Sequence, residues 1–293
     1  MNMNSVTTVF VILNYKTYKD TLVLVDSLLE QGLGNRRIII VDNASPNESY
    51  KILSERYGNN NSIDVIYSKE NGGFSKGNNI GLKFAKKYNP KYACVINNDV
   101  RFSISTIEYI EHIYAAIPNA GILAPKQIKP DGTDVGFLRL NAPTFWRDFF
   151  YYIPGYIKLF GRKHRYIQNT DIKGVQKVGF IPGAFLFLDY KLFESCGFFE
   201  ELTFLFCEER IICKKIHDLK LCNYIVFSHA YIHDHSTTIN KEKSLKQQNR
   251  MIFDGVCLYT QHFRKNARIK VLLLKVVYQF RQLYDKIVNS CCR

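Results

Sequence analysis

Hydrophobic positions in the first 120 residues form short runs that alternate with amphipathic stretches. Residues 6–13 are rich in β-branched side chains, which predicts a buried strand. Residues 18–31 carry leucine and valine at helical spacing and end at a glycine, which predicts a helix. The alternation continues, with strands expected at 37–41, 63–67 and 92–96 and helices at 47–57, 74–88 and 104–117. Strands separated by helices of this length imply a parallel sheet with helices on both faces.

The pattern after residue 120 is less regular. Residues 145–160 contain eight aromatic side chains, and residues 183–189 predict a further buried strand. A helical run follows within 202–217, and residues 241–263 predict another helix. Residues 269–288 carry apolar side chains three and four positions apart, which predicts an amphipathic helix.

Asparagine and aspartate residues stand at the ends of the predicted parallel strands. Ligands of such sheets bind beyond the carboxyl ends of the strands, where these polar side chains meet at one edge. The pattern therefore predicts a binding site there. The residues are Asn14 and Tyr15, Asp42 and Asn43, Glu70 and Asn71, and Asn97, Asn98 and Asp99.

Composition and charge narrow the class of protein. The chain has 293 residues, of which 46% are hydrophobic, so it can bury a large core. It has no apolar run of about 18 residues, the length that a transmembrane helix needs. Its first residues contain no basic stretch leading into an apolar one, so we expect no signal peptide.

The positive charge is concentrated in two segments. The net charge is +14, of which residues 264–293 carry +7 and residues 139–177 carry +6. Such patches indicate a local anionic partner: a membrane surface, a polyphosphate or a nucleic acid. The sequence contains no signature of a nucleic-acid-binding module, so we expect no nucleic acid partner.

The glycine-rich segment 70–81 is suited to close approach of a phosphate, although a plain turn between strand and helix has the same composition. It matches neither of the two best-known nucleotide-binding loops. Residues 73–77 do match the pattern of a nucleophile elbow, which makes Ser75 the candidate nucleophile of a serine hydrolase. That elbow requires the serine directly after a strand, whereas a loop follows Tyr67 here.

Three acidic residues are candidates for chemistry. Asp99 follows a buried strand, where a carboxylate can hold a divalent cation on two phosphate oxygens, or can form an Asx turn. A second ligand would come from His233 or His235. Glu208 and Glu209 precede a helical run, where one of them can serve as a general base, or both can complement the helix dipole.

The order of these segments resembles family 2 glycosyltransferases of the GT-A fold, in particular the rhamnosyltransferase-like branch. The resemblance implies an α/β fold with a Rossmann-like mixed, mostly parallel sheet flanked by helices, followed by a C-terminal helical extension. Residues 1–240 would form the GT-A domain, with a nucleotide-binding half at 1–100 and an acceptor half at 101–240. The matching stretches are 11–16, 40–45, 70–79, 95–100, 182–187, 197–201, 204–215 and 233–236.

The resemblance also implies roles for single positions. Asp99 closes the family's metal-binding motif and, with His233, would hold Mg²⁺ or Mn²⁺ on the donor diphosphate. Gly183 and Ala184 would shape the acceptor side. Glu209 would be the catalytic base, with Glu208 beside it. The nucleotide-sugar would be bound by Asn14, Tyr15, Asp42, Asn43, Asn71, Gly73, Lys76, Asn78 and Asn98.

The implied reaction is inverting transfer of a sugar from a nucleotide-diphosphate donor to a glycan or a polyprenyl-diphosphate-linked acceptor in polysaccharide synthesis. The branch favours dTDP-rhamnose over UDP-sugars. The family's usual second acidic position is Ile211 here, so a non-catalytic relative is an alternative.

We expect the protein to be cytoplasmic and associated with the inner face of the cell membrane. The basic amphipathic segment 241–293 would bind an anionic membrane surface, although a helix that packs on the body or on a partner subunit gives the same pattern. The aromatic segment 145–160 is either an interfacial anchor or part of a buried helical core.

Overall fold

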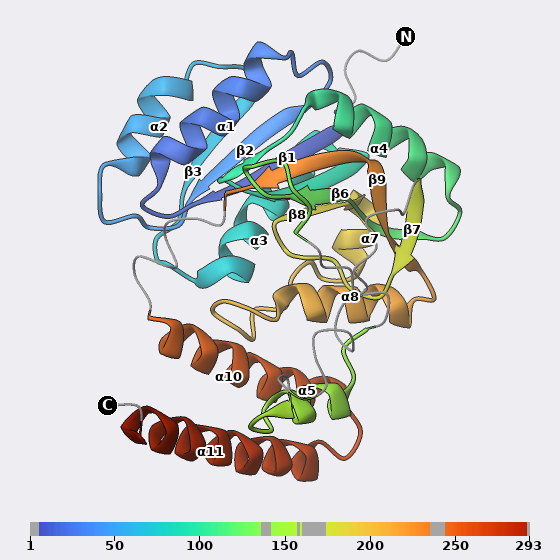
Figure 1. The fold of residues 1–293 in the computed structure, drawn as a ribbon. Coiled ribbons are helices and arrows are strands. Elements are labelled where there is room, and N and C mark those ends of the chain that lie inside the picture. Colours follow the sequence, from blue (N-terminus) through green and yellow to red (C-terminus); the bar gives the residue numbers. More distant parts are fainter. Residues whose placement is uncertain (1–5, 136–141, 157–158, 160–173, 235–243, 292–293) are drawn as a thin grey trace.

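Figure 1 shows the computed structural model of the protein, which describes residues 6–135, 142–156, 159, 174–234 and 244–291. In these residues, nine strands form one sheet in the order β3-β2-β1-β4-β8-β6-β9-β5, with β7 paired to β9. The main hydrophobic core lies on both faces of this sheet.

The first four strands form a parallel half-sheet, as the sequence predicts. These strands are β1 (Thr8–Asn14), β2 (Arg37–Asp42), β3 (Ile63–Tyr67) and β4 (Tyr92–Asn97). Helices α1 and α2 cover one face and α3 the other (Figure 1), which explains why β1, β2 and β4 are apolar along nearly their whole length. The helices are α1 (Tyr18–Glu30), α2 (Ser49–Tyr57) and α3 (Gly73–Ala85), which the 3₁₀ helix η1 (Lys86–Tyr88) continues.

The second half of the sheet is mixed. Strand β8 (Phe185–Asp189) lies antiparallel between β4 and β6 (Ala120–Ile128). Strand β9 (Cys222–His233) pairs parallel with β6 and antiparallel with β5 (Val100–Arg101) and β7 (Val175–Val178). Only β8 among these strands was expected. The helices of this half are α4 (Ile104–Ala116), α7 (Tyr190–Ser195) and α8 (Glu208–Asp218).

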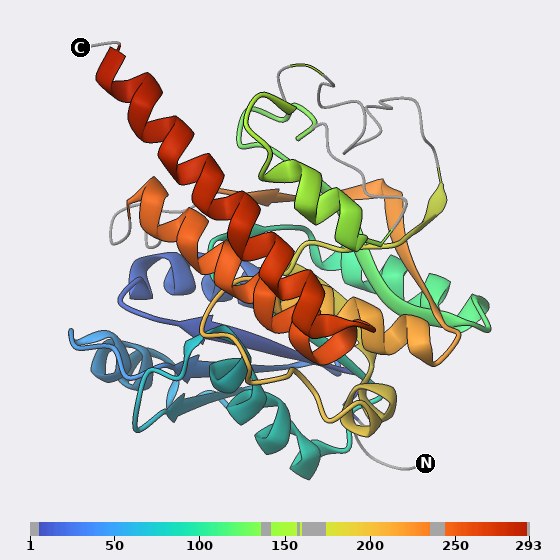
Figure 2. The same cartoon turned by 90° about the horizontal axis from the view of Figure 1, so that it is seen from below.

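A separate helical layer lies below the sheet domain in Figure 1 and in front of it in Figure 2. It consists of α5 (Phe145–Tyr151), α10 (Leu245–Phe263) and α11 (Ala267–Cys291). Phe145 and Tyr152 are buried in a second hydrophobic cluster with residues of α10 and α11. Part of the aromatic segment is therefore a buried core, whereas Trp146 is 58% exposed. Helices α10 and α11 of the extension predicted at 241–293 therefore pack together with α5, which comes from the middle of the chain.

A buried ion cluster joins this layer to the sheet domain. Asp148 on α5 accepts hydrogen bonds from Arg210 of α8 at 2.7 Å and from Arg264, between α10 and α11, at 2.9 Å. All three side chains are at most 10% exposed. Gly255 of α10 reinforces the contact, because a Cβ atom there would lie 2.9 Å from the Cys207 sulfur.

Replacing Asp148 is predicted to destabilise the protein strongly. Asp148→Ala leaves two buried guanidinium groups without their shared anion, which costs about 3–5 kcal/mol. Urea denaturation would measure the change in the free energy of unfolding. The control is Asp254→Ala, which removes an exposed pair with Arg250 on α10 and costs about 0.5 kcal/mol. Equal losses of unfolding free energy in the two variants would show that the buried cluster stabilises the protein no more than an exposed ion pair does.

Candidate active site

The carboxyl ends of the parallel strands meet at one edge of the sheet. Asn14 is opposite Asp42 in the pairing of β1 with β2, and Leu13 is opposite Asn97 in the pairing of β1 with β4. Asp42 is also opposite Tyr67, the last residue of β3. The edge predicted from the sequence is therefore formed.

Asn14 and Asp42 are completely buried and bonded to each other. The Asn14 amide donates to Asp42 Oδ2 at 2.7 Å, and the Ser45 backbone donates to Asp42 Oδ1 at 2.9 Å. Asn14 in turn accepts from the Thr21 hydroxyl at 2.9 Å. These bonds fix the loops after β1 and β2, whereas the next residue, Tyr15, is partly exposed. A direct contact of Asp42 with a nucleotide base stays a prediction.

Asn43, Asn71 and Gly73 form a second bonded group. The Asn43 amide donates to Asn71 Oδ1 at 2.9 Å and to the Gly73 carbonyl at 3.1 Å. Gly73 has a φ of +79°, and a Cβ atom there would lie 2.0 Å from the Phe204 carbonyl oxygen. The next amide, that of Phe74, donates to the same oxygen at 2.9 Å. Glycine is thus required at 73, where the loop leading into α3 touches the loop that precedes α8.

The first turns of α3 contain the remaining residues of the predicted phosphate loop. Asn78 is buried and donates to the Phe74 carbonyl at 3.0 Å, while Lys76 is half-exposed and paired with Glu70. Ser75 is 1% exposed, and its hydroxyl has no hydrogen-bond partner among the described residues. A nucleophile must reach its substrate and a base, so this burial gives the serine hydrolase alternative no support.

Asn98 binds the end of β4 to the start of α1. Its amide donates to the Thr17 hydroxyl at 2.7 Å and to the Thr21 hydroxyl at 3.0 Å. These hydrogen bonds hold the backbone of residues 97–99 in place, which fixes the position of Asp99. The side chain of Asn98 itself is occupied by these contacts.

Asp99 and His233 are brought together although 134 positions separate them. The His233 Nε2 atom lies 3.3 Å from Asp99 Oδ1, and the two side chains are 13% and 6% exposed. The pairing of β5 with β9 fixes the distance, since Val100 is opposite His233 and the Asp234 amide donates to the Asp99 carbonyl. Gln127 of β6 lies 3.3 Å from the other ring nitrogen. Gln127 could not be identified from the sequence, because strand β6 was not predicted.

Asp99 and His233 would supply two ligands of a divalent cation. Their carboxylate oxygen and imidazole nitrogen lie close together, and donors of these kinds suit Mg²⁺ or, better, Mn²⁺. Among the described residues, no group of three or more His, Cys, Asp or Glu side chains forms a complete metal site. Further ligands would have to come from a bound diphosphate and water. His235, the alternative ligand, lies outside the described residues.

Glu208 and Glu209 begin α8, and their environments differ. Glu208 is 6% exposed, and its Oε2 atom has no hydrogen-bond partner among the described residues. Glu209 is partly exposed, and a Cβ atom on Gly183 would lie 3.7 Å from its Cβ. The segment expected to shape the acceptor side therefore lies beside Glu209. Ile211 is fully buried, so no acidic side chain of this helix replaces it.

Burial raises the pKa of Glu208 well above its ordinary value, and the nearby charge of Glu209 raises it further. Glu208 is therefore harder to ionise than a free glutamate side chain, while Glu209 is partly exposed and lies beside Gly183. The helix starts after two residues with positive φ, Phe206 at +70° and Cys207 at +73°. Such left-handed backbone is uncommon for residues other than glycine, and here two such residues in succession set the start of α8.

The mixed sheet, the strand-end edge and the paired Asp99 and His233 define a GT-A-like α/β fold. Residues 9–192 match the glycosyl transferase family 2, and the chain belongs to this family.

Two relatives of known assignment align with the chain. The low-salt glycan biosynthesis hexosyltransferase Agl10 of Haloferax volcanii is 25% identical over 204 residues, which are 69% of this chain and 59% of that protein. The bifunctional glycosyltransferase pgtA of Dictyostelium discoideum is 33% identical over 88 residues, 30% of this chain and 11% of that protein. The chain therefore spans only part of the length of both.

Solved structures share the fold at low sequence identity. GalNAc-T7, crystallised with UDP, GalNAc and Mn²⁺, gives a TM-score of 0.61 at 13% identity, over 88% of this chain and 48% of that one. Residues 1–349 of S. aureus TarS, in complex with UDP-GlcNAc, give a TM-score of 0.55 at 14% identity, over 95% of this chain and 73% of that one. At these identities the likeness establishes the architecture.

The buried Glu208 makes stability depend on pH in a specific direction. Its pKa is higher in the folded than in the unfolded protein, so its contribution to stability is complete at low pH and is lost as the pH rises above about 4.5. Glu208→Gln keeps the size and shape of the side chain but removes its ionisable carboxyl group. We expect the free energy of unfolding to fall less between pH 5 and pH 8 in this variant than in the wild type.

Chemical denaturation across this pH range measures the difference. Glu55→Gln, which replaces an exposed carboxylate on α2, is the control and should follow the wild-type curve. Parallel curves for Glu208→Gln and the wild type would show that Glu208 is already ionised in the folded protein.

Proposed function

We propose that the protein transfers a sugar from a nucleotide-diphosphate donor with inversion at the anomeric carbon. The observation that carries this proposal is the 3.3 Å approach of His233 to Asp99 at the strand ends, in a chain of this family. Asp99 and His233 would hold a divalent cation, which neutralises the charge of the leaving diphosphate. Gly73 and the start of α3 lie under the same edge and would support the nucleotide.

Glu209 is the base in this proposal. It would take the proton from an acceptor hydroxyl, and that oxygen then attacks the anomeric carbon from the side opposite to the diphosphate. The neighbouring Glu208 is buried, so Glu209 is the glutamate that an acceptor would reach. With Ile211 in the core and Glu208 buried, Glu209 is the partly exposed acidic residue in the first turn of α8 and would face the acceptor.

The sugar and the nucleotide are the next part of the proposal. The resemblance to the rhamnosyltransferase-like branch favours dTDP-rhamnose, whereas GalNAc-T7 and TarS are solved with UDP or UDP-GlcNAc. A donor panel must therefore contain both nucleotides. The acceptor we propose is a glycan carried on a polyprenyl diphosphate at the inner face of the cell membrane.

Helix α11 supports a location at a membrane. Its outward face exposes large apolar side chains, while Leu274, Val277 and Tyr278 on the other face are buried. No helix in the described ranges has both the length and the hydrophobicity to cross a bilayer. The exposed residues are Ile269, Leu272, Leu273, Val276, Phe280, Leu283, Tyr284, Ile287 and Val288.

Basic residues line both edges of this apolar face. Successive residues of an α-helix are rotated by about 100° around its axis. Lys270 and Arg281 therefore lie on one side of the centre of the apolar face, and Lys275 and Lys286 lie on the other side. A helix that lies in the surface of an anionic leaflet has this arrangement, since the apolar face enters the bilayer and the lysines reach the headgroups. The charge and the exposed face therefore support an anionic membrane as the partner of α11.

The metal and the base can be tested separately. The wild type should gain thermal stability from UDP or dTDP sugars only when Mn²⁺ or Mg²⁺ is present. Asp99→Asn is predicted to lose this gain together with activity. Glu209→Gln is predicted to keep it while turnover falls by roughly 10²–10⁴-fold.

A thermal-shift panel with and without EDTA, followed by a product assay, measures both quantities. Asn60→Asp, in the turn after α2, changes the charge away from the strand ends and serves as the control. Metal-dependent nucleotide binding that survives in Asp99→Asn would refute the assignment of Asp99, and unchanged turnover in Glu209→Gln would refute the base.

Membrane binding by α11 predicts a loss of affinity when its exposed apolar residues become polar. Phe280→Ser combined with Leu283→Ser should reduce co-sedimentation with phosphatidylglycerol vesicles by roughly tenfold or more, because each side chain contributes about 1.5–3 kcal/mol when buried. The matched control is Val23→Ser with Leu219→Ser, which alters equally exposed residues outside α11. Undiminished vesicle binding, or a concentration-dependent dimer that the same double variant abolishes, would refute the membrane as partner.

A further inference from the structure

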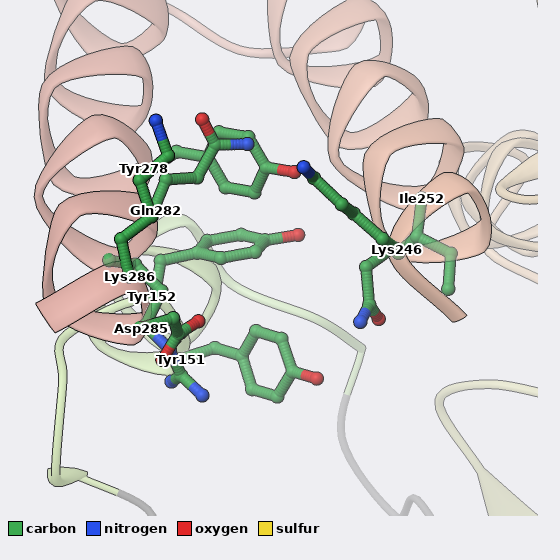
Figure 3. A pocket seen from close by; sticks show the side chains of 10 residues that line it. Tyr151, Tyr152, Lys246, Ile252, Tyr278, Gln282, Asp285 and Lys286 are labelled. Carbon is green, nitrogen blue, oxygen red and sulfur yellow. The ribbon is translucent and has the colours of Figure 1, made fainter. Parts of the chain in front are cut away.

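A cavity of about 460 Å³ lies between α5, α10 and α11 (Figure 3). None of the strand-end residues lines it, so it is distinct from the candidate active site. Its size is that of pockets that hold small molecules. The proposed transfer reaction makes no use of it.

One wall of the cavity is formed by three tyrosines. Tyr151 and Tyr152 come from the end of α5, and Tyr278 comes from α11; Figure 3 shows their hydroxyl groups directed across the gap toward α10. Tyr152 is only 6% exposed, yet its hydroxyl points into the cavity. Its ring is fixed edge-on against Tyr278, with ring centres 5.4 Å apart and an angle of 86° between the planes.

The phenol of Tyr152 is held in its neutral form. Burial raises its pKa above the ordinary value of a tyrosine, and the neighbouring Tyr151 adds to the effect. A neutral phenol both donates and accepts hydrogen bonds, which suits it to a sugar hydroxyl. A buried, rigid donor of this kind is already in position before a ligand arrives.

The cavity carries net positive charge. Figure 3 shows Lys246 on α10 across the gap from the tyrosines and Lys286 on α11 beside Tyr152, and no carboxylate among the described residues lies within 4.0 Å of either ammonium group. Arg281 and Asp285 also line the cavity, but they are paired with each other at 3.0 Å, so their charges offset. Two lysines without an anion next to phenol hydroxyls form a site for an anion that also carries hydroxyl groups.

Amide side chains complete the polar lining. Asn249 and Gln282 contribute both donors and acceptors, and Ile252 is the aliphatic residue of the lining. A lipid acyl chain would leave the phenols, amides and lysines without partners, which is costly. A phosphorylated hexose has the matching groups: a charge for the lysines, hydroxyls for the phenols and amides, and C–H faces for the tyrosine rings.

We propose that the cavity between α5, α10 and α11 is a second binding site, which takes a phosphorylated sugar. Such a ligand has two sources, a free sugar phosphate and the glycosyl-phosphate headgroup of a lipid. The inference goes beyond the proposed transfer reaction, since it requires neither the donor nor the cation. Its failure and the failure of the proposed function are therefore distinguishable.

The experiment uses the full chain without nucleotide or metal. Trp146 is the single tryptophan of the chain and lies on α5, so its fluorescence reports on the helix that carries Tyr151 and Tyr152. Glucose 1-phosphate is titrated in one arm, and vesicles with a glycosylated phospholipid in the other. Calorimetry confirms the binding constants, with glucose, inorganic phosphate and vesicles without the glycosyl lipid as reference ligands.

The expected result is saturable binding in at least one arm that weakens roughly tenfold in Lys246→Ala and in Tyr152→Phe, which removes only the hydroxyl. Lys265→Ala, an equal change of charge at the other end of the helical hairpin, should bind like the wild type. Binding in the first arm identifies a free sugar phosphate, and binding in the second arm alone identifies a lipid headgroup. Equal binding of inorganic phosphate, or no effect of the two cavity variants in either arm, would overturn the proposal.

Discussion

The pairing of β5 with β9 is the constraint on which the candidate site depends. Strand β5 has only two residues, but its register sets Val100 opposite His233 and so places His233 against Asp99. A shift of the register by one residue would turn the histidine to the other face of the sheet. A short antiparallel ladder at the end of a mixed sheet thus brings two distant segments of the chain together.

The strand-end residues divide into two kinds. Asn14, Asp42 and Asn98 use their polar atoms on neighbouring loops, which holds the edge in a fixed shape. Glu209 and Tyr15 retain exposed surface at the same edge. A binding site benefits from this arrangement. The buried polar groups hold the accessible ones in place, so the accessible groups lose little conformational freedom when a ligand binds.

The parallel half of the sheet was predictable from the sequence, whereas in the mixed half only β8 and the helices α4 and α8 were predicted and strands β5, β6, β7 and β9 were not. Strands β1, β2 and β4 are almost completely buried between helices, so their apolar runs are clear. Strand β6 begins as an apolar run but then contains Pro125 and polar residues, and β9 mixes polar and aromatic residues over twelve positions without a clean alternation. Their ladders depend on contacts between distant segments, which leave no local pattern.

The same limit applies to the site. Asp99 was recognisable because it ends a clear strand, and His233 through the family resemblance, whereas Gln127 lies on an unpredicted strand and was missed. The helix expected within 202–217 begins only at Glu208, after two residues with positive φ that no sequence pattern indicated. The helix expected at 74–88 changes after Ala85 into a 3₁₀ turn. Strand β8 begins at Phe185 rather than at 183.

The contact at Gly73 links two loops that come from distant parts of the chain. The carbonyl of Phe204 accepts the Phe74 amide and stands where any side chain at position 73 would be. The loop that leads into α3 therefore does not slide freely past the loop that leads to Glu209. In the proposed reaction the first loop would support the donor and the second would lead to the base, so a donor that displaced one loop would also disturb the other.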